Sequence, residues 1–87
     1  MSGVEPPARR PKMNFSDTHL LNTLPARIEA LNTAIAALQH TLSDPGLYAR
    51  DAPTFSRLSA QLAEAQAAKA ADEELWLNLE LKREKMG

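Results

Sequence analysis

The first half of this chain carries an apolar pattern that leaves few folds open to it. From Leu21 to Leu42, apolar residues recur at alternating steps of three and four, without a break. This spacing places them on one narrow stripe of an α-helix, the a and d positions of a coiled coil, which must be covered by a partner helix. The stripe consists of Leu21, Leu24, Ile28, Leu31, Ile35, Leu38 and Leu42.

Pro25 lies inside that stripe. Proline has no amide proton for a helical hydrogen bond and its ring crowds the preceding turn, so a kink or a restart is expected at Leu24–Pro25. The sequence therefore predicts a short helical segment over 17–24 and a main helix over 25–42. Ser16 is suited to cap the first segment, and Asp17 is suited to the positive end of the helix dipole.

The second half continues the same spacing, but two of its stripe positions are polar. Lys69 and Asp72 stand where apolar residues are expected. We favour a local shift of the stripe toward Ala68 and Leu75, with the Lys69 ammonium reaching water. A buried Lys69–Asp72 pair is the alternative, and desolvation makes it costly. The full stripe is Phe55, Leu58, Leu62, Ala65, Lys69, Asp72, Trp76, Leu79, Arg83 and Met86.

Two helices joined by a short connection run antiparallel and cover each other's stripes. The predicted fold is therefore all-α: a monomeric antiparallel two-helix coiled-coil hairpin over 15–86, with helices near 17–42 and 54–85. The expected register sets Leu42 opposite Leu58 and Leu24 opposite Trp76, and a register shifted by one heptad is the alternative. Residues 1–14 are expected to be a flexible linker or an expression-derived tail.

The connection has the composition of a shaped turn. Asp44-Pro45-Gly46 combines a turn-starting carboxylate, a fixed φ and a residue that tolerates the left-handed region. Asp51 or Thr54 is suited to cap the second helix, with Pro53 in its first turn. A structured loop should therefore close the tip, with three apolar residues folded back onto the stripe near Leu42 and Leu58. These residues are Leu47, Tyr48 and Phe55.

Composition excludes several classes of function. The 87 residues contain no cysteine and no apolar run long enough to cross a membrane, so we expect a cytoplasmic domain without a membrane contact. His19 and His40 are far apart and are expected on the surface, so no metal site is predicted. Glu73 and Glu74, with Asp72, are expected to form a solvated helix face. We predict that this chain is not an enzyme and holds no cofactor.

Basic residues gather at the two ends of the chain. If the chain folds as a hairpin, both groups lie at its open end, where they can contact phosphates without reading sequence. Charged termini that only keep the domain in solution are the alternative. Trp76 is expected in the core beside Leu24, and base stacking is its less favoured role. The predicted nucleic-acid-binding residues are Arg9, Arg10, Lys12, Lys82, Arg83 and Lys85.

Several segments of the chain resemble the C-terminal coiled-coil domain of ABC-F ATPases, specifically the Uup-like branch. The resemblance covers roughly residues 12–83. It departs from the family pattern at Lys69, where relatives usually have an apolar residue, and at Asp51-Ala52-Pro53, where they have Asp-Pro. The segments read "KMNFSDTHLLNTLP", "LPARIEALNTAIAALQHTLSDPGLYARD", "FSRLSAQLAEAQA" and "ELWLNLE".

This resemblance implies an accessory domain of a larger cytoplasmic protein. ABC-F proteins carry two ATP-binding cassettes, and in the Uup-like branch this domain follows the second cassette and binds DNA. The resemblance thus favours DNA over RNA as the partner, with the ATPase activity in the parent protein. The alternative is a structural arm that docks on the parent ATPase domains or on the ribosome, with Leu47 and Tyr48 as its docking tip.

Overall fold

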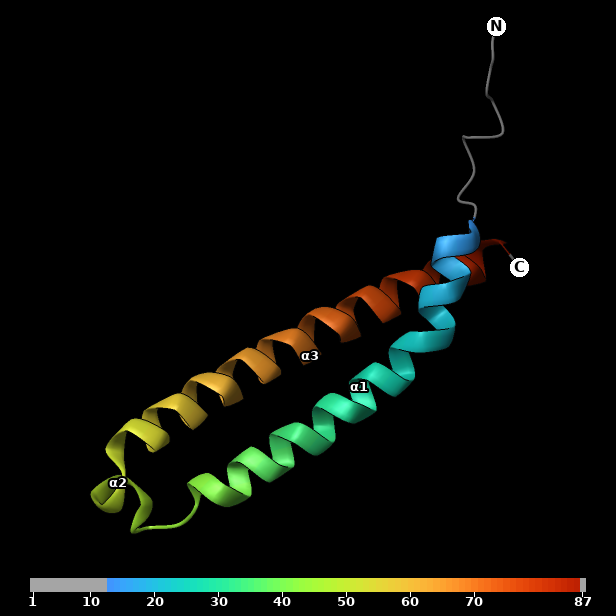
Figure 1. Cartoon of the computed structure of the whole chain (residues 1–87). Coiled ribbons are helices and arrows are strands. Elements are labelled where there is room, and N and C mark those ends of the chain that lie inside the picture. The colour runs from blue at the N-terminus through green and yellow to red at the C-terminus, as the bar shows by residue number, and fades with distance from the viewer. Residues whose placement is uncertain (1–12, 87) are drawn as a thin grey trace, which may run out of the picture.

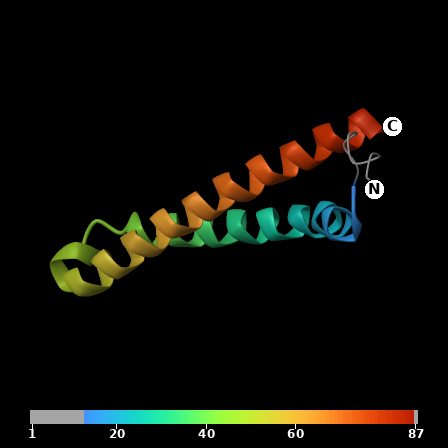
Figure 2. The same cartoon turned by 90° about the horizontal axis from the view of Figure 1, so that it is seen from above.

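The computed structural model describes residues 13–86 of the chain as a long helical hairpin. Helix α1 (Phe15–Leu42) and helix α3 (Ala52–Met86) lie side by side and antiparallel, and the short helix α2 (Leu47–Arg50) closes one end (Figure 1). This part of the chain measures 68 × 23 × 15 Å, contains no strand, and is elongated in both perpendicular views (Figure 2). The predicted all-α hairpin is confirmed.

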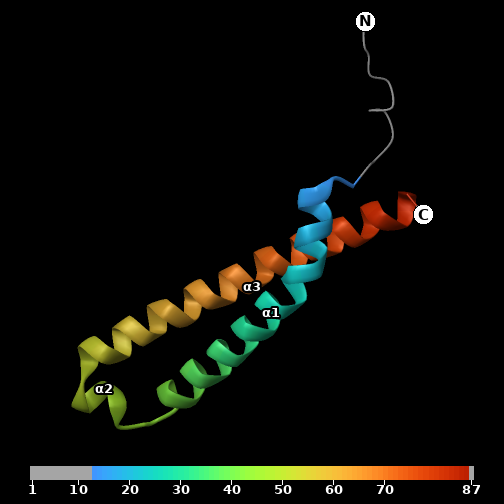
Figure 3. The same cartoon turned by 45° about the vertical axis from the view of Figure 1, so that its right-hand side comes forward.

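Helix α1 is continuous through Pro25 and begins earlier than the sequence suggested. Its N-cap is Asn14, whose side-chain oxygen accepts a hydrogen bond of 2.8 Å from the amide of Asp17, so the expected cap at Ser16 was wrong. The axis of α1 changes direction near Pro25, as Figures 1 and 3 both show. The kink was therefore predicted correctly, whereas the division into two helices was not, because the backbone turns without leaving the helix.

The stripe of α3 passes through Lys69 and Asp72 rather than around them. Asp72 is buried and Lys69 is half-buried, whereas Ala68 and Leu75 are exposed. Both sequence-based interpretations were wrong, because the favoured shift does not occur and the carboxylate of Asp72 pairs with Arg27 of α1 instead of Lys69. Asp72 pairs with Arg27 rather than with Lys69 because Arg27, on the facing helix, reaches the carboxylate while its own guanidinium stays near water.

Two ion pairs between the helices fix their register. Arg27 contacts Asp72 at 2.6 Å, and Asp17 contacts Lys82 at 2.7 Å, one pair near the bend and one near the helix ends. Both pairs agree with the register that sets Leu24 opposite Trp76, and a shift of one heptad would separate them by about 10 Å. Leu24 and Leu79 are buried at this end of the stripe.

The tip is closed by hydrogen bonds between residues that are close in the sequence. The carboxylate of Asp44 accepts from the amide of Gly46 at 3.0 Å and from Arg50 at 2.7 Å. Asp51 caps α3 by accepting from the amide and hydroxyl of Thr54, at 3.2 and 2.7 Å. These contacts confirm a structured loop with Asp51 as the cap.

Two details of the tip differ from expectation. Gly46 has φ −95°, so it does not use the left-handed region. A Cβ at Gly46 would lie 3.0 Å from a guanidinium nitrogen of Arg50, and this exposed side chain can move to make room. Leu47 is buried as predicted, but Tyr48 remains 62% exposed and meets Phe55 edge-on, with ring centroids 5.4 Å apart.

Candidate functional site

The open end of the hairpin brings the start of α1 against the end of α3. The ammonium of Lys82 donates to the carboxylate of Asp17 at 2.7 Å, and both side chains are largely covered. This hydrogen bond is the main reason that the pKa of Asp17 lies below its usual value. Lys82 is therefore held in place by a carboxylate that also neutralises it.

The other two predicted cations of α3 differ in their surroundings. Arg83 donates to the carboxylate of Glu80, one turn earlier on the same helix. Lys85 is exposed and has no carboxylate partner within the described residues. Of the three C-terminal basic residues, two are thus engaged by acids and one is open to solvent.

The remaining predicted cations, Arg9, Arg10 and Lys12, lie outside the described residues. Their attachment point is nevertheless defined, because Met13 precedes α1 at the open end. Of the six predicted cations, the structure thus shows Lys82, Arg83 and Lys85 at the open end of the hairpin.

The predicted docking tip separates into a buried and an exposed residue. Leu47 packs inward and is only 8% exposed, so it supports the tip rather than offering a surface. Tyr48 is the exposed apolar side chain there. Arg50 is paired with Asp44, and this hydrogen bond raises the pKa of the guanidinium and lowers that of the carboxyl.

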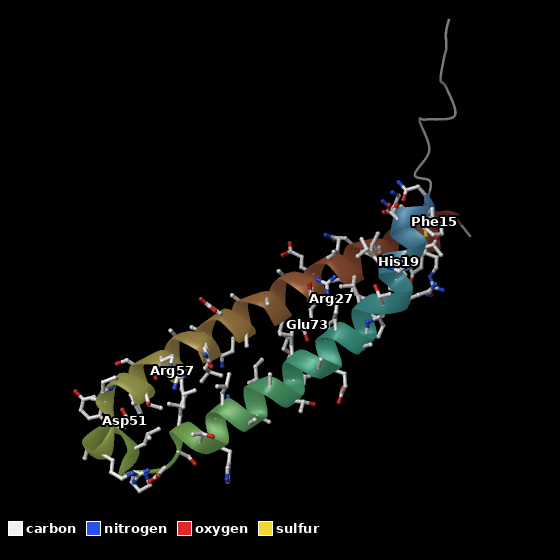
Figure 4. The ribbon with its side chains drawn as sticks, viewed as in Figure 1. Phe15, His19, Arg27, Asp51, Arg57 and Glu73 are labelled. Atoms are coloured by element: carbon white, nitrogen blue, oxygen red, sulfur yellow. The ribbon has the colours of Figure 1, made fainter. Side chains whose placement is uncertain are left out.

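An ion pair between the helices escaped the sequence analysis. The side chain of Arg27, labelled in Figure 4, lies between α1 and α3. Its guanidinium donates to both carboxylate oxygens of Asp72, at 2.6 and 3.3 Å. A signal was present, since Arg27 precedes the stripe residue Ile28, which the predicted register sets opposite Asp72. The expectation that Asp72 belongs to a solvated acidic face was wrong, while Glu73 and Glu74 are exposed as predicted.

A groove along one side of the hairpin also escaped the sequence analysis. Its part near the bend has a volume of about 520 Å³ and is lined by side chains of both helices, which are apolar except for Glu73. Trp76 lies in its wall, half-buried rather than fully enclosed in the core. The lining residues are Pro25, Ile28, Glu73, Trp76 and Leu77.

Neither a metal-ligand cluster nor a membrane-spanning helix is found among the described residues. Residues 13–86 contain no cluster of three or more potential metal ligands, and His19 and His40 are both exposed as predicted. No helix within this range is long and apolar enough to span a bilayer.

Comparison with known proteins identifies the domain. The family model for the ABC transporter C-terminal domain matches residues 12–81, which is most of the chain and nearly all of the hairpin. No curated protein and no solved structure matches significantly. The matched family is a small helical accessory domain without ATPase cassettes, in agreement with a non-catalytic role for these 87 residues. The chain belongs to the ABC transporter C-terminal domain family.

Proposed function

We propose that this domain belongs to an ABC-F ATPase of the Uup-like branch and binds DNA through its open end with little sequence specificity. Two motifs beyond the heptads support the branch, the Asp44 to Tyr48 tip and Trp76 between its flanking leucines. The parent protein would be cytoplasmic and would carry the ATP-binding cassettes.

The Asp17–Lys82 contact is the observation that carries the DNA proposal. It places the first turn of α1 beside the last turns of α3. Arg9, Arg10 and Lys12 precede α1 in the sequence, so they join the hairpin at the end that carries Lys82, Arg83 and Lys85. A phosphate backbone could contact both groups at once.

The carboxylates at this end set the strength of the interaction. Asp17 and Glu80 occupy the cationic groups of Lys82 and Arg83, so a phosphate must compete with them for two of the three C-terminal cations. We therefore expect weak, strongly salt-dependent binding in which Lys85 and the residues before Met13 make the first contacts.

Releasing the engaged cations is the sharpest test. The double substitution Asp17→Asn with Glu80→Gln should strengthen binding to unrelated duplexes several-fold at low salt. It should also steepen the salt dependence, by up to about 0.9 in the logarithmic slope for each additional phosphate that the freed cations neutralise. Fluorescence anisotropy of labelled duplexes, at a series of salt concentrations, measures both quantities.

A matched control separates released cations from a simple change in net charge. Glu64 and Glu74 are exposed and lie in no ion pair of the described chain, so Glu64→Gln with Glu74→Gln removes the same charge without freeing a cation. The control should strengthen binding much less. Equal effects of the two double variants, or no duplex binding by any of them at low salt, would contradict the proposal.

A docking arm is the second candidate, and exposed Tyr48 is the observation that favours it. An apolar contact through the tip depends little on salt, unlike phosphate binding. If Tyr48→Ala abolishes binding to the isolated ATPase domains or to ribosomes while open-end substitutions leave it unchanged, the domain acts as an arm.

A further inference from the structure

The first turns of α1 are held to α3 without a buried side chain of their own. Over residues 15–23, which we call the lead segment, every side chain is exposed or half-buried. The next residue, Leu24, is fully buried. The lead segment is therefore a lightly packed end of α1 that is joined to a firmly packed residue.

Pro25 makes this junction a hinge. The helix lacks the hydrogen bond that an amide at position 25 would donate, and its axis changes direction there (Figures 1 and 3). On one side of Pro25, Leu24 is enclosed, and on the other, Arg27 donates to Asp72 at 2.6 Å. A rotation at the hinge consequently moves the lead segment while the rest of α1 stays on α3.

One ion pair joins the lead segment to α3 within residues 13–86. Asp17 and Lys82 meet at 2.7 Å, with side chains that are 17% and 33% exposed. At 1.5 Å per residue, Asp17 lies about 12 Å along the helix from Pro25. A contact so far from the hinge resists rotation well, because it acts on a long lever arm. The Asp17–Lys82 pair thus has the position of a latch.

We propose that a DNA phosphate opens this latch by taking Lys82 from Asp17, and that the lead segment then turns away from α3 about Pro25. The inference rests on the proposed function, because it assigns a regulation to the same site. A phosphate that accepts a hydrogen bond from Lys82 leaves the carboxylate of Asp17 beside a like charge. Their repulsion is relieved when the lead segment moves away.

The coupling between binding and opening acts in both directions. Opening frees Lys82, so a chain that opens more easily binds DNA more tightly, and bound DNA favours the open form by the same factor. The resting form is closed, because the register sets Leu21 opposite the buried Leu79 and opening removes apolar cover from both. The latch is therefore an autoinhibitory contact.

Two pairs of spin labels measure the opening, since the chain has no cysteine to replace. Labels on Ser16→Cys and Asn78→Cys, both at exposed positions, report the distance from the lead segment to α3. Labels on Ala34→Cys and Ala67→Cys, also exposed, form the control pair beyond the bend. A rotation of about 20° moves the end of the lead segment by about 5 Å, which pulsed electron paramagnetic resonance resolves.

The ligand is a short DNA duplex, and its addition should lengthen the first distance while the control distance stays the same. Asp17→Asn and Lys82→Gln should each lengthen the first distance without duplex, because each removes the latch. Glu29→Gln is the matched control, since it removes an exposed carboxylate that lies in no ion pair of the described chain. It should leave both distances unchanged.

Three results would overturn the inference. These are an unchanged first distance in both latch variants, a duplex that binds by anisotropy without lengthening it, and equal lengthening of both distances, which would indicate general unfolding. A duplex that binds without opening the lead segment leaves the proposed function intact. If the latch variants open the segment but no duplex binds, the proposed function is wrong, and phosphate-driven opening is wrong with it.

Discussion

The tip of the hairpin is held by residues that are neighbours in the sequence, whereas the open half is held by residues from opposite helices. Asp44 and Arg50 are six positions apart, and Asp51 and Thr54 are three apart. At the other end, Arg27 and Asp72 are 45 apart. The two ends therefore form by different routes, one through turn chemistry and one through the meeting of α1 and α3.

This difference assigns separate roles to the two ends. Local contacts at the tip do not depend on helix pairing and can form early, because they close only short loops. The contacts of the open half form only when the helices pair in one register. Substitutions in the open half should consequently affect the whole hairpin, and those at the tip should act mainly on the turn.

The largest effect is expected at Leu24, which is fully buried in the open half. Leu24→Ala should destabilise the hairpin by about 2–5 kcal/mol, since it removes a buried side chain and leaves a cavity. Urea denaturation followed by circular dichroism measures the loss. Leu38→Ala, at a half-buried position nearer the tip, is the control and should cost clearly less. Equal costs would remove the contrast between the two regions.

The next effect concerns the ion pair that spans the helices. Arg27→Met keeps the alkyl stem but leaves the buried carboxylate of Asp72 without its donor, so it should cost about 1–3 kcal/mol. Adding Asp72→Leu to the same chain should restore much of that stability, because the stripe then becomes apolar. If the single variant is as stable as the parent chain, the pair contributes nothing to the register.

A smaller gain is expected midway along α3. Lys69 is half-buried at a stripe position and has no carboxylate partner within the described residues. Lys69→Leu should raise the melting temperature by roughly 4–8 °C, corresponding to about 1 kcal/mol in a domain of this size. Lys85→Leu, at an exposed position, serves as the control. A lower melting temperature for Lys69→Leu would mean that its ammonium makes a favourable contact.

The smallest effects depend on pH. Hydrogen bonds from Lys82, Arg50 and Thr54 hold the pKa values of Asp17, Asp44 and Asp51 below their usual range. Since the folded pKa is the lower one, their stabilisation is present above about pH 4 and is lost as the pH falls through the folded values.

Asp17→Asn should therefore lower the melting temperature near neutral pH, and the deficit should shrink on acidification below about pH 4. Asp44→Asn should behave in the same way but with a smaller deficit, since its ion pair is more exposed. Melting curves across this pH range give both differences. A deficit that grows on acidification would contradict the assigned hydrogen bonds.

The sequence predicted best those features that local rules determine. The apolar stripe, the antiparallel pairing, the register and the Asp51 cap all follow from spacing and turn chemistry, and the structure contains each of them. The first cap was misplaced because Asn14 and Ser16 are both residue types that cap helices, and the sequence pattern alone does not choose between them.

Features that depend on the facing helix were harder to predict. When α3 is considered alone, Asp72 at a stripe position suggests that the stripe shifts locally. The cation that compensates its charge, Arg27, is on α1. Counting basic residues at the open end likewise could not show that Lys82 is engaged by Asp17 of α1. The Arg83–Glu80 pair is different, because its spacing of three on one helix is visible in the sequence and was overlooked. The groove also required the structure, since its walls come from both helices.

Pro25 gives the two long helices unequal stiffness. It has no amide proton to donate to the carbonyl of Leu21, so α1 bends more easily there than elsewhere, while α3 runs for 35 residues without an internal proline after its first turn. If the hairpin is bent by a sideways force, α3 should stay straight while α1 bends at Pro25. The first ten residues of α1 lie before this bend and are held to α3 by the Asp17–Lys82 pair, and Arg27, just after the bend, is held by Asp72, so the two ion pairs brace the bend from both sides.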